Sequence, residues 1–443
     1  MNDMGDPTFL RPQARRRGGG RPALAMALAF VLSAPANAQL APGPLLIPAL
    51  PTPDIGGTLD RTLGTAQQLE GSAARLADGR TTRLRDLVRR NRKTLDVDNA
   101  GQPVVRSEVL ALGPSAASLS IAYRDGFVLD RQGKLSSLGI ELVVLRSPPG
   151  FSTVQAVNRL RRLDPGGRYD FDHLYGPAAE PSPRHEGRPK ACTAASAVGA
   201  RLGLIDGEAA VGHPAFASAG VEQRNFSPGR DTVSAHGTAV ASLMIGQAPG
   251  FSGVAPGARL YAADVYSAGP TGGSADAIVR ALDWMAANRV PVINVSLVGP
   301  ANLLLEAAIR ALGVRGELVV APVGNDGPAA PPQYPASYPG VVAVTAVDAK
   351  GRLLPEAGRA SHVDFAALGA GVTVAKPAGG YDRVRGTSFA APVVAGRLGL
   401  LLHEPDPVRS GEAISSLAAR ARRAGPGLGH GVVGGTPTPG SSC

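Results

Sequence analysis

The 443-residue chain is predicted to contain a three-layer α/β domain with a mostly parallel sheet, preceded by a small α+β domain. Alternation of two kinds of segment predicts the larger domain. Apolar, strand-like runs lie near residues 201–205, 260–265, 291–297, 317–322 and 341–345, and helix-like segments lie near 236–246, 272–288, 301–312 and 387–402. Such alternation favours parallel strands joined by right-handed crossovers. Any reactive groups are then expected at the carboxyl ends of the strands.

A strand, helix and strand pattern predicts the smaller domain, at about residues 100–176. Residues 140–145 predict a strand, residues 168–172 predict a second strand, and the helix expected between them, at 152–163, has Val154, Val157, Leu160 and Leu163 on one face. The Pro- and Gly-rich segments 39–60 and 177–190 flank this domain, and we expect both to be disordered. The apolar content of 44% is ample for a buried core.

Residues 1–38 have the pattern of a signal peptide. Arginines precede an apolar run at 23–33, and Ala36-Asn37-Ala38 is typical of a signal peptidase site. Arg15-Arg16-Arg17 leaves a twin-arginine route open as an alternative. The run is too short for a permanent membrane span, so the expected product is exported to the periplasm or the extracellular space. Cys192 and Cys443 permit one disulfide, and whether they are bridged stays open.

Ser388 lies in Gly386-Thr387-Ser388-Phe389-Ala390-Ala391-Pro392, where a buried apolar helix is expected to begin near Thr387 or Ser388. A helix N-terminus carries partial positive charge and stabilises a developing oxyanion. Ser388 is therefore a candidate nucleophile. A serine that merely caps a core helix is the alternative, and other residues must decide between them.

Three further segments supply the groups that a nucleophilic serine needs. Asp206 follows the buried strand 201–205, at the position where open α/β sheets place reactive groups. His236 lies at the start of a helix of small residues and is the candidate base. Asn325 lies in a glycine-flanked turn after the strand 317–322, and its amide is the candidate oxyanion donor.

Together these four segments resemble the Asp, His, Asn and Ser motifs of the subtilisin-like serine proteases, the subtilases of peptidase family S8. The chain order also matches, with His about 30 residues after Asp and Ser about 150 residues later. The resemblance implies that Ser388 attacks the scissile carbonyl, His236 transfers the proton and Asp206 orients the imidazole. It implies that Asn325 and the Ser388 N–H bind the oxyanion. The resulting activity is that of a secreted serine endopeptidase acting on proteins or peptides through an acyl-enzyme.

The resemblance also assigns a substrate-binding cleft. Residues 291–300 are similar to the strand that pairs with an extended substrate in this family. The implied substrate-binding residues are Ser296, Leu297, Val298, Gly299, Val323 and Gly324. Val298 stands where the family commonly has glycine, and Pro322-Val323 replaces smaller residues on the other wall, which predicts a narrow pocket for a small or medium aliphatic side chain.

A small α+β domain and a loose linker before the larger domain resemble a subtilase propeptide that inhibits its own enzyme until it is cut. The sequence thus divides into signal peptide (1–38), propeptide region (39–190), catalytic domain (191–424) and a flexible tail (425–443). Processing is expected near residues 177–195. An unrelated binding domain kept in the mature enzyme is the alternative interpretation of the small domain.

Other classes of function fit the residues less well. Arg75 to Lys93 predicts a basic amphipathic helix, and with the leader it carries part of the net charge of +10. No nucleic-acid-binding module is visible. An esterase is disfavoured because a second glycine of the nucleophile elbow is missing, and a catalytically dead binding protein is disfavoured by the four intact motifs. The sequence shows no catalytic metal motif, no cofactor is needed for the chemistry, and by resemblance a structural calcium could be bound. We expect a monomer.

Overall fold

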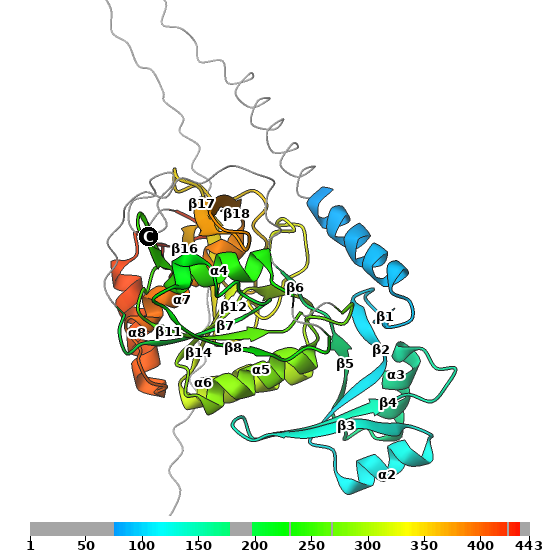
Figure 1. Cartoon of the computed structure of the whole chain (residues 1–443). Helices are drawn as coiled ribbons and strands as arrows, with labels where there is room; N and C mark the ends of the chain where they lie inside the picture. The colour runs from blue at the N-terminus through cyan, green and yellow to red at the C-terminus, as the bar shows by residue number, and fades with distance from the viewer. Residues whose placement is uncertain (1–74, 178–196, 230–231, 267–268, 423–424, 435–443) are drawn as a thin grey trace, which may run out of the picture. The chain divides into compact units, whose positions relative to one another are not determined.

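Two large sheets organise the chain in the computed structural model, which describes residues 75–177, 197–229, 232–266, 269–422 and 425–434 (Figure 1). A five-stranded sheet belongs to residues 75–177, here called the N-terminal domain. An eight-stranded sheet belongs to residues 197–434, here called the C-terminal domain. Both lie within one unit that spans residues 57–443.

The N-terminal domain is an antiparallel sheet with helices. Its strand order is β1-β2-β4-β3, and β5 pairs with the other side of β2. The elements are a helix at 75–90, β1 (Leu95–Val97), β2 (Pro103–Leu112), α2 (Ala116–Arg124), β3 (Val128–Leu135), β4 (Ile140–Arg146), α3 (Thr153–Leu163) and β5 (Tyr169–His173). The expected strand, helix and strand are β4, α3 and β5. Ser152 and Gln155 begin α3 with a capping box, which satisfies two backbone N–H groups.

The C-terminal domain has the predicted three-layer arrangement. Its sheet has the order β19-β16-β15-β14-β12-β7-β11-β8, and every neighbouring pair is parallel. The strands are β7 (Arg201–Asp206), β8 (Gly220–Asn225), β11 (Arg259–Asp264), β12 (Val292–Val295), β14 (Leu318–Pro322), β15 (Val341–Val347), β16 (Phe365–Leu368) and β19 (Val432–Val433). α5 and α6 pack together on one face, and α4 and α7 pack together on the other (Figure 1).

The helices and the short strands complete this domain. The α-helices are α4 (Ala235–Ile245), α5 (Ala275–Ala287), α6 (Leu303–Arg315), α7 (Ala391–Gly399) and α8 (Pro407–Arg420). The shorter elements are β6 (Gly176–Pro177), η1 (Pro214–Phe216), β9 (Gln247–Ala248), β10 (Phe251–Ser252), β13 (Leu297–Val298), β17 (Ala370–Ala375), β18 (Tyr381–Arg385) and η2 (Thr387–Phe389). Among the described residues, no helix is long and apolar enough to cross a membrane.

Three local predictions need correction. The helix expected from residue 387 begins at Ala391, because Ser388 lies in the separate 3₁₀ turn η2, and Pro392 is in the first turn of α7. The predicted tail from residue 425 starts too early, because β19 pairs with Ala366 and Ala367 and completes the sheet edge. Pro177 was assigned to a disordered linker, but it pairs with Leu297 in β6. The leader, the segment 39–60, Cys192 and Cys443 lie outside the described residues, so those predictions stand as predictions.

Candidate active site

Asp206 and His236 meet at the carboxyl end of the central strand β7. The Asp206 side chain is buried at the last residue of this strand, between β12 and β11. His236 Nδ1 lies 2.8 Å from Oδ2 and 3.0 Å from Oδ1 of Asp206. The carboxylate also accepts the Gly207 N–H at 2.7 Å. Because a carboxylate only accepts, Nδ1 of the neutral imidazole carries the proton, and Nε2 is left as the basic nitrogen.

Close packing of α4 against the loop after β7 fixes the position of His236 relative to Asp206. Ser234 caps α4 by accepting the Gly237 N–H at 3.0 Å, which places His236 in the first turn. A Cβ on Gly237 would lie 2.0 Å from the Gly207 carbonyl oxygen. Only a residue without a side chain lets the helix come so near. Gly237 therefore positions the imidazole beside Asp206.

The residue that follows Ser388 packs against the same imidazole. The ring of the next residue, Phe389, packs 5.4 Å from the His236 ring between centroids. Ser388 is fully buried, and neither its Oγ nor His236 Nε2 has a hydrogen-bond partner among the described residues. Unpaired buried polar atoms are costly and rare in folded proteins. Both unpaired atoms are explained if Ser388, as a nucleophile, and His236, as a base, form a close contact only when substrate is bound.

Asn325 joins the loop after β14 to the serine turn. Its Oδ1 accepts the Thr387 N–H at 3.0 Å, and the Thr387 hydroxyl donates to the Gly324 carbonyl at 3.2 Å. These bonds link two segments that are 62 and 63 residues apart in the chain. With the amide oxygen held by the residue before Ser388, the amide nitrogen is the end of the Asn325 side chain that could donate to an oxyanion.

The end of the N-terminal domain forms a strand in the predicted cleft. β6 pairs antiparallel with β13, with Pro177 opposite Leu297 and Gly176 opposite Val298. On its other side the Tyr175 N–H donates to the Gly273 carbonyl at 2.8 Å. Residues 175–177 are thus held between two segments of the C-terminal domain, as an extended peptide would be. Sequence reasoning identified the β13 side of this cleft but missed Gly273.

Tyr175 fills a pocket that was not predicted. Its side chain is 1% exposed, and its hydroxyl donates to the Pro300 carbonyl at 2.7 Å. A Cβ on Gly299 would lie 2.5 Å from Tyr175 Cδ1. A Cβ on Gly273 would lie 2.2 Å from the backbone carbonyl oxygen of Tyr175. The two glycines therefore make room for this ring and its backbone. Burial, with smaller contributions from neighbouring groups, holds the pKa of Tyr175 well above its usual value, so the hydroxyl stays a donor.

The remaining predicted cleft residues lie around β13. Ser296 is buried, accepts from Asn294 Nδ2 at 2.7 Å and donates to the Ser388 carbonyl at 3.4 Å. Val298 and Val323 are also buried. A Cβ on Gly324 would lie 3.7 Å from Val298 Cγ1 and 3.1 Å from Gln333 Cγ, so this wall leaves little space.

Two aspartates of β5 bind the N-termini of C-terminal-domain helices, and sequence reasoning missed both. Asp170 accepts the Leu303 N–H of α6 at 2.7 Å, and Asp172 accepts the Asp276 N–H of α5 at 3.0 Å. Carboxylates are favoured at helix N-termini. The Asp-x-Asp spacing in a strand places both side chains on one face, and that pattern was the available signal.

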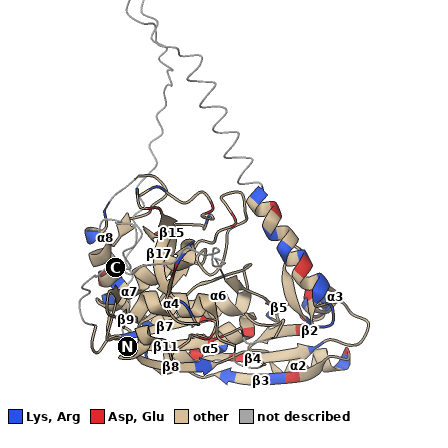
Figure 2. Ribbon diagram, turned by 45° about the horizontal axis from the view of Figure 1, so that its top comes forward, with Lys and Arg blue, Asp and Glu red and all other residues tan. Residues whose placement is uncertain are grey.

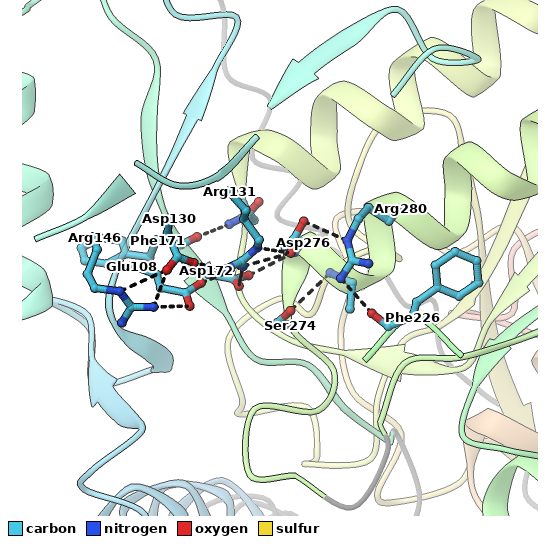
Figure 3. Close-up of polar contacts among 12 residues, drawn as sticks. Glu108, Asp130, Arg131, Arg146, Phe171, Asp172, Phe226, Ser274, Asp276 and Arg280 are labelled. Atoms are coloured by element: carbon cyan, nitrogen blue, oxygen red, sulfur yellow. Dashed lines mark hydrogen bonds and ion pairs between the residues drawn. The ribbon is translucent and has the colours of Figure 1, made fainter. Parts of the chain in front are cut away.

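A charged cluster surrounds Asp172. Arg131 lies 2.8 Å from Glu108 and 3.0 Å from Asp276, and Figure 3 shows these side chains converging on Asp172. Burial raises the pKa of Asp172 well above its usual value, and the Asp276 and Glu108 carboxylates raise it further against the opposing effects of the Asp276 N–H and Arg131. The two domains thus meet through buried carboxylates as well as through the cleft.

His213, which precedes Pro214, has a structural role. Its Nδ1 accepts the Ala215 N–H at 3.0 Å and caps η1, and its Nε2 lies 3.0 Å from the Gly380 carbonyl. Among the described residues, no group of three or more His, Cys, Asp or Glu side chains could hold a metal ion. Structural calcium bound by carbonyl groups stays a prediction.

An oriented histidine, a buried serine and an amide at the carboxyl edge of a parallel sheet are the kinds of group that serine hydrolases use. Residues 199–428, more than half of the chain, match the family model described as the subtilase family, peptidase S8. The chain belongs to the subtilase family.

Curated relatives agree with this assignment. The chain is 36% identical over 183 residues to Subtilisin Savinase of Lederbergia lenta, which covers 40% of this chain and 67% of that protein. It is 35% identical over 176 residues to Subtilisin E of Bacillus subtilis, which covers 38% of this chain and 46% of that protein. The match thus spans less than half the length of Subtilisin E.

Fervidolysin from Fervidobacterium pennivorans, described as a keratinolytic enzyme related to subtilisin, has a similar fold. The TM-score is 0.64 at 19% identity, and the match covers 78% of this chain and 64% of that one. At this identity the similarity supports the fold alone. It agrees with the predicted subtilisin-like α/β architecture, which is confirmed.

Proposed function

We propose that this chain is a serine endopeptidase. The Oγ of Ser388 forms a bond to the scissile carbonyl carbon while its proton passes to His236 Nε2. Asn325 and the Ser388 N–H stabilise the oxyanion. His236 then gives the proton to the leaving amine, and water repeats the sequence to release the acyl group. The observation that carries this proposal is the Asp206–His236 pair with Nε2 and the Ser388 Oγ both buried and unpaired.

Labelling with a fluorophosphonate probe tests the nucleophile. The processed wild-type protein should label and hydrolyse casein, whereas Ser388→Ala should do neither. Equal labelling of both proteins would contradict the assignment of Ser388. Hydrolysis of a short-chain ester without hydrolysis of casein would favour the esterase alternative.

We also propose that the N-terminal domain is a propeptide that inhibits the enzyme. β6 occupies the cleft as a substrate strand would, and its register runs from Val298 to Leu297 toward Ser296, whose hydroxyl donates to the Ser388 carbonyl. This direction supports a maturation cut shortly after Pro177, inside the predicted interval 177–195. N-terminal sequencing of the secreted product tests it, and an active species that keeps residues 142–172 covalently attached would contradict it.

Tyr175→Ala tests the inhibitory contact. Removing a buried aromatic ring costs roughly 3–5 kcal/mol in protein cores, so inhibition by the N-terminal domain should weaken by about 100-fold or more. The measurement is the lag before protease activity appears during processing, which should shorten. Tyr123→Ala is the matched control, because Tyr123 is 43% exposed and in the same domain. Equal lags for both variants would show that Tyr175 does not hold the domain in place.

Two further proposals concern export and specificity. Residues 1–38 act as a signal peptide, and deleting them should leave the protein in the cytoplasm.

Val298, Val323 and Gly324 line a narrow pocket, so a peptide library should favour small or medium aliphatic residues before the cut. A profile dominated by aromatic residues at that position would contradict the pocket assignment.

A further inference from the structure

The helix at residues 75–90 reaches the loop that carries the candidate oxyanion residue. Arg80 Nε lies 3.1 Å from Oδ2 of Asp326, and Arg83 Nη2 lies 2.6 Å from Oδ1. Asp326 directly follows Asn325 in the loop after β14. Figure 2 shows basic residues along this helix, and two of them therefore contact the C-terminal domain beside the proposed reaction centre.

The same helix is fixed to the N-terminal domain. Its side chains Leu87 and Val88 pack against a small cluster of three buried residues, Leu95, Val105 and Leu174. Arg80 also donates to Gln102 Oε1 at 3.0 Å, so one guanidinium is held by both domains. Arg80, Arg83 and Leu87 have the spacing of a single helical face. The helix therefore belongs to the N-terminal domain and presents its charges to the C-terminal domain.

Arg80 makes the stronger of the two ion pairs. The side chains of Arg80 and Asp326 are 13% and 11% exposed, whereas that of Arg83 is 60% exposed. A guanidinium and a carboxylate that are removed from water together form a strong and directional contact, whereas an exposed ion pair contributes little. Most of the hold of the helix on this loop thus comes from Arg80.

The contact does not depend on the chain link that maturation would break. The proposed cut lies after Pro177, whereas the helix joins β1 through residues 91–94, far from the cut in the chain. Cutting the chain therefore leaves both β6 and the helix in contact with the C-terminal domain. Two contacts carried by one domain keep each other at a high effective concentration, so each delays the release of the other.

We infer that the helix at residues 75–90 is an autoinhibitory strap, which closes the Asp326 side of the site while β6 fills the cleft, and which keeps its hold after the maturation cut. The inference rests on the proposed inhibitory function of the N-terminal domain. It adds to that function a second contact, based on charge and made by a helix outside the strand, helix and strand pattern from which the propeptide was predicted.

Two double variants of the precursor test the strap. Arg80→Ala with Arg83→Ala removes both cations that contact Asp326. Arg85→Ala with Arg90→Ala is the matched control, because it removes two arginines of the same helix that are exposed and form no ion pair within the described part of the chain. The measurement is the delay between appearance of the cut product on a gel and full hydrolysis of a peptide substrate, which reports how long the cut domain stays bound.

Loss of Arg80 and Arg83 should shorten this delay about tenfold, the effect of losing a hydrogen bond between charged groups. The control should have the delay of wild type. Equal delays for the two double variants would overturn the inference. Arg80→Gln, a milder change that removes only the charge, should shorten the delay in the same direction, and thermal unfolding in the Ser388→Ala background shows whether each precursor is folded.

Salt provides a measurement that does not rely on a variant alone. Raising the salt concentration from about 0.05 M to about 0.5 M screens charges and should shorten the delay of wild type. The variant without Arg80 and Arg83 should respond less, because it has no strap contact to screen. A salt effect of equal size in both proteins would count against the strap.

Failure of the strap and failure of the proposed inhibition give different results. If the uncut wild-type precursor already hydrolyses the peptide at the full rate, the N-terminal domain does not inhibit and the proposed function of that domain is wrong. If wild type shows a delay that Tyr175→Ala shortens but the loss of Arg80 and Arg83 does not, the domain inhibits through β6 alone and the strap is wrong.

Discussion

At the proposed reaction centre, His236 and Asn325 are each oriented by a contact to a segment distant in the chain. Asp206 orients His236 from the end of β7, and Thr387 orients Asn325 from the turn that carries Ser388. None of these contacts lies within a single element. These residues can be recognised from the sequence. Their orientation depends on loops that the sheet brings together.

Asn325→Ala should lower kcat by about 100- to 1,000-fold with little change in KM, because an oxyanion donor acts mainly in the transition state. Steady-state kinetics on a peptide substrate measures this. Asn325→Asp is the informative control, since it keeps an oxygen acceptor for the Thr387 N–H but lacks the N–H donor. A near-normal kcat for Asn325→Asp would show that Asn325 acts only by positioning Thr387.

At the scale of elements, the approach of α4 to the loop after β7 determines the distance between base and carboxylate. Gly237→Ala would place a methyl group 2.0 Å from the Gly207 carbonyl oxygen, so the helix must shift. Since sub-ångström placement matters for the Asp206–His236 pair, we expect kcat/KM to fall by roughly 100-fold or more.

Gly313→Ala in α6 is the control for that substitution, because nothing lies within 4 Å of a Cβ there. It should keep full activity and raise the unfolding temperature slightly, as expected for alanine in a helix. Comparison of kcat/KM and unfolding temperature for both variants separates displacement of the helix from a general effect of the exchange. Full activity of Gly237→Ala would refute the positioning role.

Across the whole molecule, the two domains are coupled by the cluster of carboxylates around Asp172 (Figure 3). Because burial and the neighbouring carboxylates raise the pKa of Asp172 in the assembled precursor, the assembled form binds the proton more tightly than the separated or unfolded form. Its contribution to stability is fully present below the ordinary aspartate pKa of about 4 and is lost as the pH rises through the raised value.

The contribution of Asp172 to the stability of the precursor should therefore decrease as the pH rises. In a Ser388→Ala precursor, which cannot cut itself, adding Asp172→Asn should raise the unfolding temperature relative to the parent at pH 8 and change it less at pH 5. Asparagine keeps an oxygen for the Asp276 N–H but carries no charge. Thermal unfolding of both proteins between pH 5 and pH 8 measures the difference. A difference that does not vary with pH would contradict a titrating Asp172.

Much of the fold and site was predictable because the signals are local. Apolar runs of strand length alternate with helical segments, and Asp206, His236, Asn325 and Ser388 each follow a recognisable local pattern. The exact start of α7 was missed because both η2 and an α-helical turn suit the residues after Gly386. β19 was missed because two valines among glycines become a strand only beside Ala366 and Ala367.

By itself, the sequence determined the fold class, the order of the site residues and the division into a small domain and a larger one, because these depend on periodicity and on residue type. Only the tertiary structure decided which groups meet: Tyr175 with Gly273 and Gly299, Asp172 with α5, and Arg80 with Asp326. Those contacts join residues about 100 or more positions apart, up to 246 for Arg80 and Asp326. A local pattern carries no information about such a partner, because the partner is set by how the domains pack.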